Sequence, residues 1–476
     1  MKLIALKRLA GLALAAAVIG APFAGPALAQ NTAAATAAPA AAAAPEAAAP
    51  AAAPAAAAPA AATPAPPKID TGDTAWMLTS SVLVLMMTIP GLALFYAGMV
   101  RKKNILATLA QSFGATALIT VLWMVIGYSI AFTDGGKNNG LIGGVNYLLL
   151  GPMGLNSTSS LAATIPESVY MFFQMTFAII TPALIAGALA DRMKFSAFLA
   201  FMGAWLLLVY CPIAHWVWGG GWLGKAGALD YAGGTVVHLN AGTAGLVAAL
   251  MLGKRKGLGV ENMSPHNLAY SVIGASLLWV GWFGFNAGSA VTSNVNAGMA
   301  AAATQIATAG AALAWMFAEW IISKKPSVLG MVSGAVAGLV AITPASGFVN
   351  PGDALMIGIA AGIVCYISAV HVKKMFGYDD ALDAWGVHGV GGALGALLTG
   401  VFASNAINSA SKGWIHDHNP GQMILQFEDV GATFLYCAVM TFVILLAIKF
   451  TVGLRVSEEV EVEGLDINLH GEVVQA

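Results

Sequence analysis

The chain has 476 residues, of which 58% are hydrophobic and only 9% are charged. Such an apolar composition excludes a soluble globular protein with a polar surface and places the chain in a lipid bilayer. The formal net charge of −1 provides no basic excess for nucleic acid and no acidic excess for basic partners.

The amino terminus predicts a secretory signal peptide over residues 1–29. Lys7 and Arg8 precede an apolar core at 9–19, and the small residues at 27–29 form a cleavage site of the A-x-A kind. The alternative is an uncleaved membrane anchor, which the short apolar core disfavours. In either case the segment that follows is exported.

Residues 30–67 consist almost entirely of Ala, Pro and Thr. This composition is too monotonous to build a packed core, and proline interrupts it repeatedly. We therefore expect a disordered or extended tether between the signal peptide and the rest of the chain.

Eleven downstream stretches are long and apolar enough to be transmembrane helices. A span needs about 20 mainly apolar residues, because backbone polar groups inside the hydrocarbon must be bonded within the segment. The predicted fold is an all-α polytopic membrane protein. Its expected spans are 75–99, 105–132, 168–190, 195–217, 233–253, 268–289, 295–322, 328–346, 354–372, 385–404 and 430–450.

The charges between the spans predict the orientation of the bundle. Alternate loops carry basic clusters at 101–103, 192–194, 254–256, 324–325 and 373–374, whereas the opposite loops hold only Lys137, Lys225 and Lys412. Because basic loops stay in the cytoplasm, the mature amino terminus should lie outside and the tail after Phe450 inside. The signal peptide independently predicts the same orientation.

Spans one to five resemble spans six to ten weakly, which predicts two inverted five-helix repeats and a final helix. The clearest match pairs His238 with His388, since each follows a valine near the start of its span. Asp230 precedes the first histidine and Asp383 the second, and both carboxylates are expected to cap helix starts. A site near the midplane then requires the preceding chain to enter the membrane as buried irregular structure.

A histidine inside a span is costly, so His238 and His388 are predicted to be functional, as a hydrogen-bonding or proton-sharing pair. The alternative is a pair of neutral rings that bond backbone carbonyls and hold helices together. A third possibility is haem ligation between the two rings.

Aromatic residues gather near Trp218 and again around Trp282 and Phe285. They fit either an interfacial aromatic belt or a vestibule that attracts a small cation to ring faces. Phe173 and Phe177 lie one helical turn apart and share a face, a spacing that ordinary packing also produces.

The remaining candidates give little indication of chemistry. Cys211, Cys365 and Cys437 lie far apart in apolar runs, and His416 and His418 lack a third ligand at metal-binding spacing. No nucleotide-binding loop, nucleophile elbow or zinc-protease helix occurs. We therefore expect no enzyme activity, no metal and no cofactor.

Three segments together resemble the ammonium transporter (Amt/Mep/Rh) family: ALDYAGGTVVH at 228–238, GWFGFNAGS at 281–289 and GVHG at 386–389. The resemblance extends from about Asp73 to Glu472. It implies an ammonium transporter membrane domain at 68–452 and a cytoplasmic regulatory tail at 453–476, whereas the Ala/Pro tether has no counterpart in the family pattern.

Carried over residue by residue, the resemblance implies a recruitment site, a gate and a pore. The outer ammonium site would comprise Trp218, Ser289 and Phe177, with Phe173 lining the entrance. Phe177 and Phe285 would stack as a gate, and Asp230 would be a buried structural or electrostatic carboxylate. The pore would be lined by His238, His388 and Trp282.

The resemblance also implies a homotrimer in the bacterial inner membrane, with one pore per subunit and a PII-type nitrogen-signalling protein as cytoplasmic partner. Selective ammonium uptake is the expected function. The alternative is an ammonium sensor that signals through the PII-type protein, although the tail after Phe450 is short for a signalling domain.

Overall fold

The computed structural model describes residues 68–475, so the predicted signal peptide and the whole Ala/Pro tether lie outside the described residues. Within this range the chain is helical, and its only β pairings are two isolated bridges, Ser159 with Ala162 and Met193 with Arg455. The prediction of an all-α fold is confirmed.

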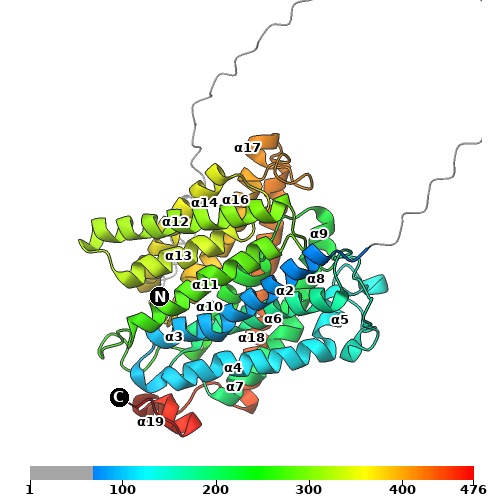
Figure 1. Cartoon of the computed structure of the whole chain (residues 1–476). Coiled ribbons are helices and arrows are strands. Elements are labelled where there is room, and N and C mark those ends of the chain that lie inside the picture. The colour runs from blue at the N-terminus through cyan, green and yellow to red at the C-terminus, as the bar shows by residue number, and fades with distance from the viewer. Residues whose placement is uncertain (1–67, 476) are drawn as a thin grey trace, which may run out of the picture. The chain divides into compact units, whose positions relative to one another are not determined.

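The first half forms the first five predicted spans (Figure 1). In chain order they are α2 (Thr71–Met86) with η1 (Met87–Leu92) and α3 (Ala93–Met99); α4 (Ile105–Leu122) with η3 (Trp123–Gly127) and α5 (Tyr128–Phe132); α6 (Glu167–Leu189); α7 (Phe195–Trp205) with η6 (Leu206–Tyr210) and α8 (Cys211–Val217); and η7 (Gly234–Leu239) with α10 (Asn240–Leu252). The connections hold the short helices η2 (Lys102–Asn104), η4 (Gly136–Asn138), η5 (Leu148–Leu150) and α9 (Trp222–Ala226).

The second half supplies the other six. They are α11 (Leu268–Gly288); α12 (Val295–Ser323); α13 (Val328–Ile342); α14 (Pro351–Tyr366) with η8 (Ile367–Val372) and α15 (Lys373–Phe376); η9 (Trp385–Gly389) with α16 (Val390–Phe402); and, after the short α17 (Trp414–Asp417), α18 (Gly421–Thr451). Ten of the eleven are long and apolar enough to cross a membrane. The exception, α13, is shorter than predicted because the chain leaves the helix at Thr343 and continues as buried turns.

The two halves meet where the helices that bear the histidines cross. A Cβ atom on Gly242 would lie 2.2 Å from the backbone nitrogen of Gly389, and one on Gly392 would lie 2.5 Å from the carbonyl oxygen of Gly234. Gly242 and Gly392 each lie four residues after a histidine, so the contact is reciprocal. Only glycine allows two backbones to approach so closely.

The carboxyl-terminal tail folds back on the loops at one end of the bundle (Figure 1). Its α19 (Glu458–Glu463) and η10 (Asp466–His470) carry the two main contacts. Asp466 accepts the backbone N–H groups of Leu106 and Ala107 at 3.0 and 2.8 Å, and so caps the start of α4. Glu461 accepts the backbone N–H of Lys256 at 2.6 Å.

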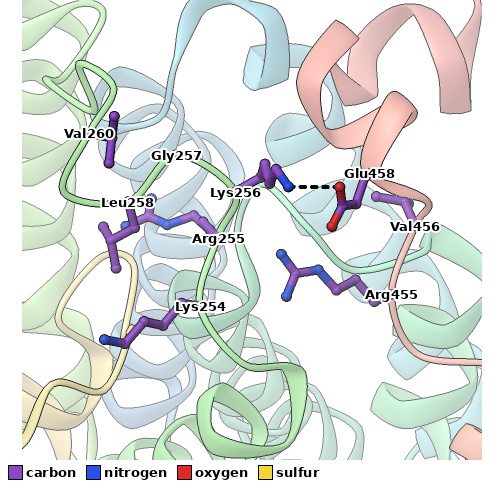
Figure 2. A pocket seen from close by; sticks show the side chains of 9 residues that line it. All are labelled: Lys254, Arg255, Lys256, Gly257, Leu258, Val260, Arg455, Val456 and Glu458. Atoms are coloured by element: carbon purple, nitrogen blue, oxygen red, sulfur yellow. Dashed lines mark hydrogen bonds and ion pairs between the residues drawn. The ribbon is translucent and has the colours of Figure 1, made fainter.

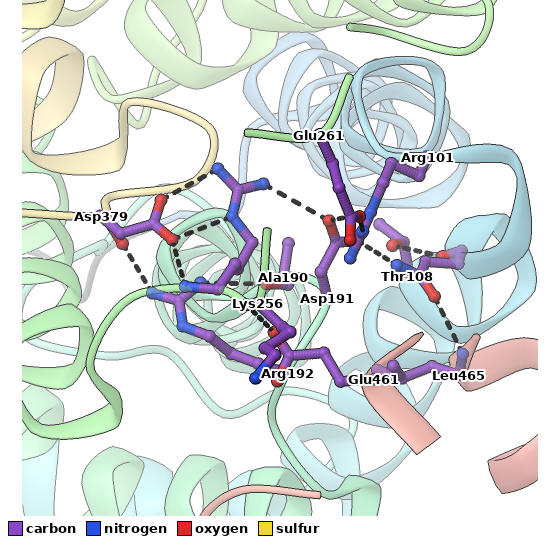
Figure 3. Close-up of polar contacts among 12 residues, drawn as sticks. Arg101, Thr108, Ala190, Asp191, Arg192, Lys256, Glu261, Asp379, Glu461 and Leu465 are labelled. Atoms are coloured by element: carbon purple, nitrogen blue, oxygen red, sulfur yellow. Dashed lines mark hydrogen bonds and ion pairs between the residues drawn. The ribbon is translucent and has the colours of Figure 1, made fainter. Parts of the chain in front are cut away.

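Beneath the tail, buried ion pairs join four loops (Figure 3). Asp191 contacts Arg101 at 3.2 Å and Arg255 at 3.4 Å, and Arg255 also contacts Asp379 at 2.9 Å. Burial alone would raise the pKa of Asp379, but the hydrogen bonds and charge of Arg255 hold that pKa below its ordinary value.

Between these loops and the tail lies a pocket of about 510 Å³ (Figure 2). Basic side chains surround it, namely Lys254, Arg255, Lys256 and Arg455. Three of the four cations are paired: Lys256 contacts Glu458 at 2.7 Å, Arg455 contacts Glu461 at 2.7 Å, and Arg255 contacts Asp379 at 2.9 Å. The predicted cytoplasmic loops and the tail thus form one layer.

The helix crossing gives the first testable prediction. Replacing Gly242 by valine should lower the thermal midpoint of the purified protein in detergent, because the new side chain must push apart two backbones in a packed interior, at a cost of roughly 1–3 kcal/mol. Gly431→Val is the matched control, since a Cβ atom at Gly431 meets nothing within 4 Å. Equal midpoints for the two variants would contradict the close crossing.

Candidate functional site

Asp230 organises the chain that leads to His238. The segment before η7 is buried but not helical, which is the buried irregular structure expected if the histidines lie near the midplane of the membrane. Oδ1 of Asp230 accepts the N–H groups of Gly233 and Gly234 at 2.7 and 2.6 Å, and Oδ2 accepts those of Thr235 and Val236 at 2.9 and 3.1 Å. The predicted cap is confirmed.

The second histidine has an equivalent cap, but not the predicted one. Asp380 accepts the N–H groups of Ala384 and Trp385 at 3.1 and 2.7 Å. Asp383, the expected cap, has φ +60° and its carboxylate pairs instead with Lys373. The choice of Asp383 was therefore wrong: Lys373 holds its carboxylate, and the carboxylate of Asp380, three residues earlier, reaches the free N–H groups instead.

The two imidazole rings are in contact. Nδ1 of His238 lies 3.3 Å from Nδ1 of His388, and the rings stack with centroids 5.3 Å apart. One Nδ1 must carry a proton and the other must accept it, so at least one of the two rings is neutral; two neutral rings of opposite tautomer, or one neutral and one protonated ring, satisfy the contact. Each ring lies in a wide π-helical turn, η7 or η9, a distortion often found at functional sites.

Aromatic rings continue the histidine pair as a column. Phe285 lies 5.9 Å from His238 and stacks on Phe177 at 4.2 Å with an interplanar angle of 24°. Phe173 follows at 4.9 Å from Phe177. All these side chains are nearly inaccessible to solvent. Rings from α6, α11 and η7 therefore form a continuous column above His388, in which stacked, tilted and edge-to-face contacts occur.

Two tryptophans flank this column. Trp282 stacks on His238 with centroids 5.3 Å apart and donates its indole N–H to Thr343 Oγ1 at 2.9 Å. Trp218 stands perpendicular to Phe177 at 5.9 Å and donates its indole N–H to the carbonyl oxygen of Asp230 at 2.8 Å. Both indoles are held by hydrogen bonds with their ring faces beside the column.

Ser289 ends α11 at the same end of the column. Its hydroxyl donates to the carbonyl oxygen of Phe285 at 2.8 Å, the local bond that span-end serines commonly make. The hydroxyl proton is thereby used, whereas the oxygen lone pairs stay available as acceptors.

Sequence reasoning missed the polar side chains that support the site from α18 and α13. Gln426 accepts the N–H of Leu229 at 2.8 Å and donates to its carbonyl at 2.9 Å. Thr343 anchors Trp282. One signal was present for the second cap, because Asp380 and Asp230 both lie eight residues before a histidine.

Comparison with known proteins agrees with the resemblance in the sequence. Residues 75–475 match the model of the Ammonium Transporter Family. The chain is 53% identical to an ammonium transporter of Aquifex aeolicus over 85% of this chain and 93% of that protein. It is 49% identical to one from Bacillus subtilis over 84% and 98% of the two chains.

Solved structures share the fold. The crystal structure of Candida albicans Mep2 superposes with a TM-score of 0.77 at 36% identity, covering 82% of this chain and 88% of that one. A structure described as a sensor Amt protein superposes with a TM-score of 0.76 at 28% identity, covering 84% of this chain and 98% of that one. On the family match, the identities and the shared eleven-helix fold, this multi-pass membrane protein belongs to the ammonium transporter family.

Proposed function

We propose that the chain moves ammonium across the bacterial inner membrane by recruiting the cation at an outer aromatic site, removing a proton and passing ammonia along the histidine pair. The continuous column of rings from Phe173 to His388 carries this proposal. Apolar rings cannot replace the hydration shell of a cation, so a neutral molecule is the favoured passenger.

Recruitment takes place where Trp218, Phe177 and Ser289 meet, with Phe173 beside them. Ring faces attract a small cation, and the free lone pairs of the serine oxygen accept its hydrogen bonds. Asp230 contributes through its field, because backbone donors occupy both of its oxygens and leave none to bind the cation directly.

Phe177 and Phe285 form the gate. Their stacked rings, 4.2 Å apart, leave no room between them for a passenger, so one ring must rotate for each passage. Below the gate, Trp282 and the two histidines line the path. The histidines either line the route of ammonia alone or also carry the released proton, which makes transport electrogenic.

The layer formed by basic loops and tail supports a cytoplasmic position for the carboxyl terminus and an outer position for residue 68. Basic loops at 101–103 and 254–256 lie with the tail at one end, as the positive-inside rule demands. We further propose a homotrimer, with a PII-type protein meeting this layer.

Removing the indole tests the recruitment site. Trp218→Leu should raise the apparent KM for ammonium roughly tenfold, because it deletes a desolvated ring face worth about 1–2 kcal/mol to a cation. Trp222→Leu, on a partly exposed tryptophan, is the control. Uptake by proteoliposomes measures both, and an unchanged KM in Trp218→Leu would contradict recruitment at this ring.

Removing one histidine tests proton transfer. In solid-supported-membrane electrophysiology, His388→Ala should abolish the ammonium-evoked current, since the Nδ1 partner of His238 is lost. Ammonia flux, followed by internal pH, should persist. The exposed His266 supplies the control His266→Ala. A full current in His388→Ala would show that the pair only lines the path.

The sensor is the second candidate, because the chain resembles a sensor Amt structure. Transport predicts that expression of this chain restores growth of an ammonium-uptake-deficient strain at low ammonium and acidic pH, where little ammonia diffuses unaided. Trp222→Leu should restore growth equally, and Trp218→Leu poorly. Ammonium binding without restored growth would favour the sensor.

A further inference from the structure

A second buried carboxyl group lies behind Asp230. Asp429, on α18, is fully buried, and Asp230 is 5% exposed. The hydroxyl oxygen of Thr235 lies between them, 2.7 Å from Oδ2 of Asp230 and 2.9 Å from Oδ2 of Asp429. The three side chains therefore form a short polar chain from α18 to the turn that carries His238.

Counting protons shows that two carboxylates cannot both be satisfied here. The Thr235 hydroxyl has a single proton, so it can donate fully to only one of its two neighbours. Within residues 68–475, no Lys, Arg or His nitrogen lies within 4.0 Å of either carboxyl group. Two unpaired anions this close in a desolvated site would be strongly unfavourable.

The contacts also indicate which group holds the extra proton. Both oxygens of Asp230 are used as acceptors by four backbone N–H groups, which fits an anion. Among residues 68–475, the carboxyl group of Asp429 hydrogen-bonds only with hydroxyl groups, Thr235 at Oδ2 and Thr433 at 3.5 Å from Oδ1. That arrangement fits a carboxylic acid whose Oδ2–H donates to Thr235 while Oδ1 accepts from Thr433.

We propose that Asp429 is a neutral acid that positions the recruitment site by donating to Thr235, which in turn donates to Asp230. The positioning role rests on the proposed recruitment of ammonium, whereas the protonation of Asp429 does not. Asp429 is a positioning residue, since it does not touch the passenger. Its proton leaves Asp230 as the single anion behind Trp218.

A neighbouring contact made by α18 supports this positioning role. Gln426 lies one turn before Asp429 on the same helix face and bonds both backbone groups of Leu229. The two side chains thus hold the irregular segment at both ends, with Asp230 between them. A lost donor at Asp429 would release the Thr235 hydroxyl and loosen the cap that positions Trp218.

Infrared spectroscopy tests the protonation directly. The difference spectrum between wild type and Asp429→Asn, in reconstituted membranes at neutral pH, should contain the carbonyl band of a protonated carboxylic acid in the wild type. Glu428→Gln, which removes an exposed neighbouring acid, should leave that band in place. A wild-type spectrum with a carboxylate signal at Asp429 in place of this band would overturn the proposal.

Transport tests the positioning. Asp429→Asn should keep the KM for methylammonium within about twofold, because the amide N–H₂ replaces the acid as donor without changing the charge. Asp429→Leu should raise KM roughly tenfold, as expected for a lost hydrogen bond beside a charged group. In a Thr235→Val background, Asp429→Leu should add less than twofold. An Asn variant as impaired as the Leu variant would contradict the positioning role.

The two measurements separate this inference from the proposed function. If wild-type proteoliposomes show no ammonium-dependent uptake, the proposed function fails, while the infrared band still decides the protonation of Asp429. If uptake is normal and the band is missing, only the present inference fails.

Discussion

The capping of η7 by the Asp230 carboxylate is the interaction on which the rest of the site depends. Inside a bilayer, four free N–H groups at a helix start would each cost several kcal/mol, and this carboxylate accepts four of them. It thereby allows a helix to begin deep in the protein. The first turn of that helix presents His238, and the carbonyl of the capping residue holds Trp218.

The same constraint explains the polar residues on the apolar helices around it. Asp380 caps η9, and Gln426 bonds the buried backbone N–H and carbonyl groups of Leu229. Each polar side chain lies where the main chain departs from a regular helix. Irregular backbone at this depth is tolerated only when it is enclosed by such partners. The polar residues therefore lie next to the site and bond the irregular backbone that carries it.

Local patterns in the sequence were sufficient for the spans and for the histidines, because hydropathy and helix length are properties of contiguous residues. They were insufficient for contacts between distant segments. Asp383 was expected to cap the second histidine helix, but its pairing with Lys373 and the cap from Asp380 are contacts that the sequence does not display. The same holds for Asp429, which is 194 positions from Thr235 and reads as an ordinary charge near a span boundary.

The proposed site keeps the charged carboxylate of Asp230 apart from the path that the passenger would take through the rings. The column contains phenyl rings and two imidazole rings that share one proton, whereas the carboxylate of Asp230 lies to one side with its oxygens occupied by backbone donors. An anion within the column would hold ammonium too tightly to release it, and a site without an anion would attract it weakly. A carboxylate beside the first ring, with its oxygens already occupied by hydrogen-bond donors, attracts ammonium without binding it directly. A second ionised carboxylate at Asp429 would strengthen this attraction too far.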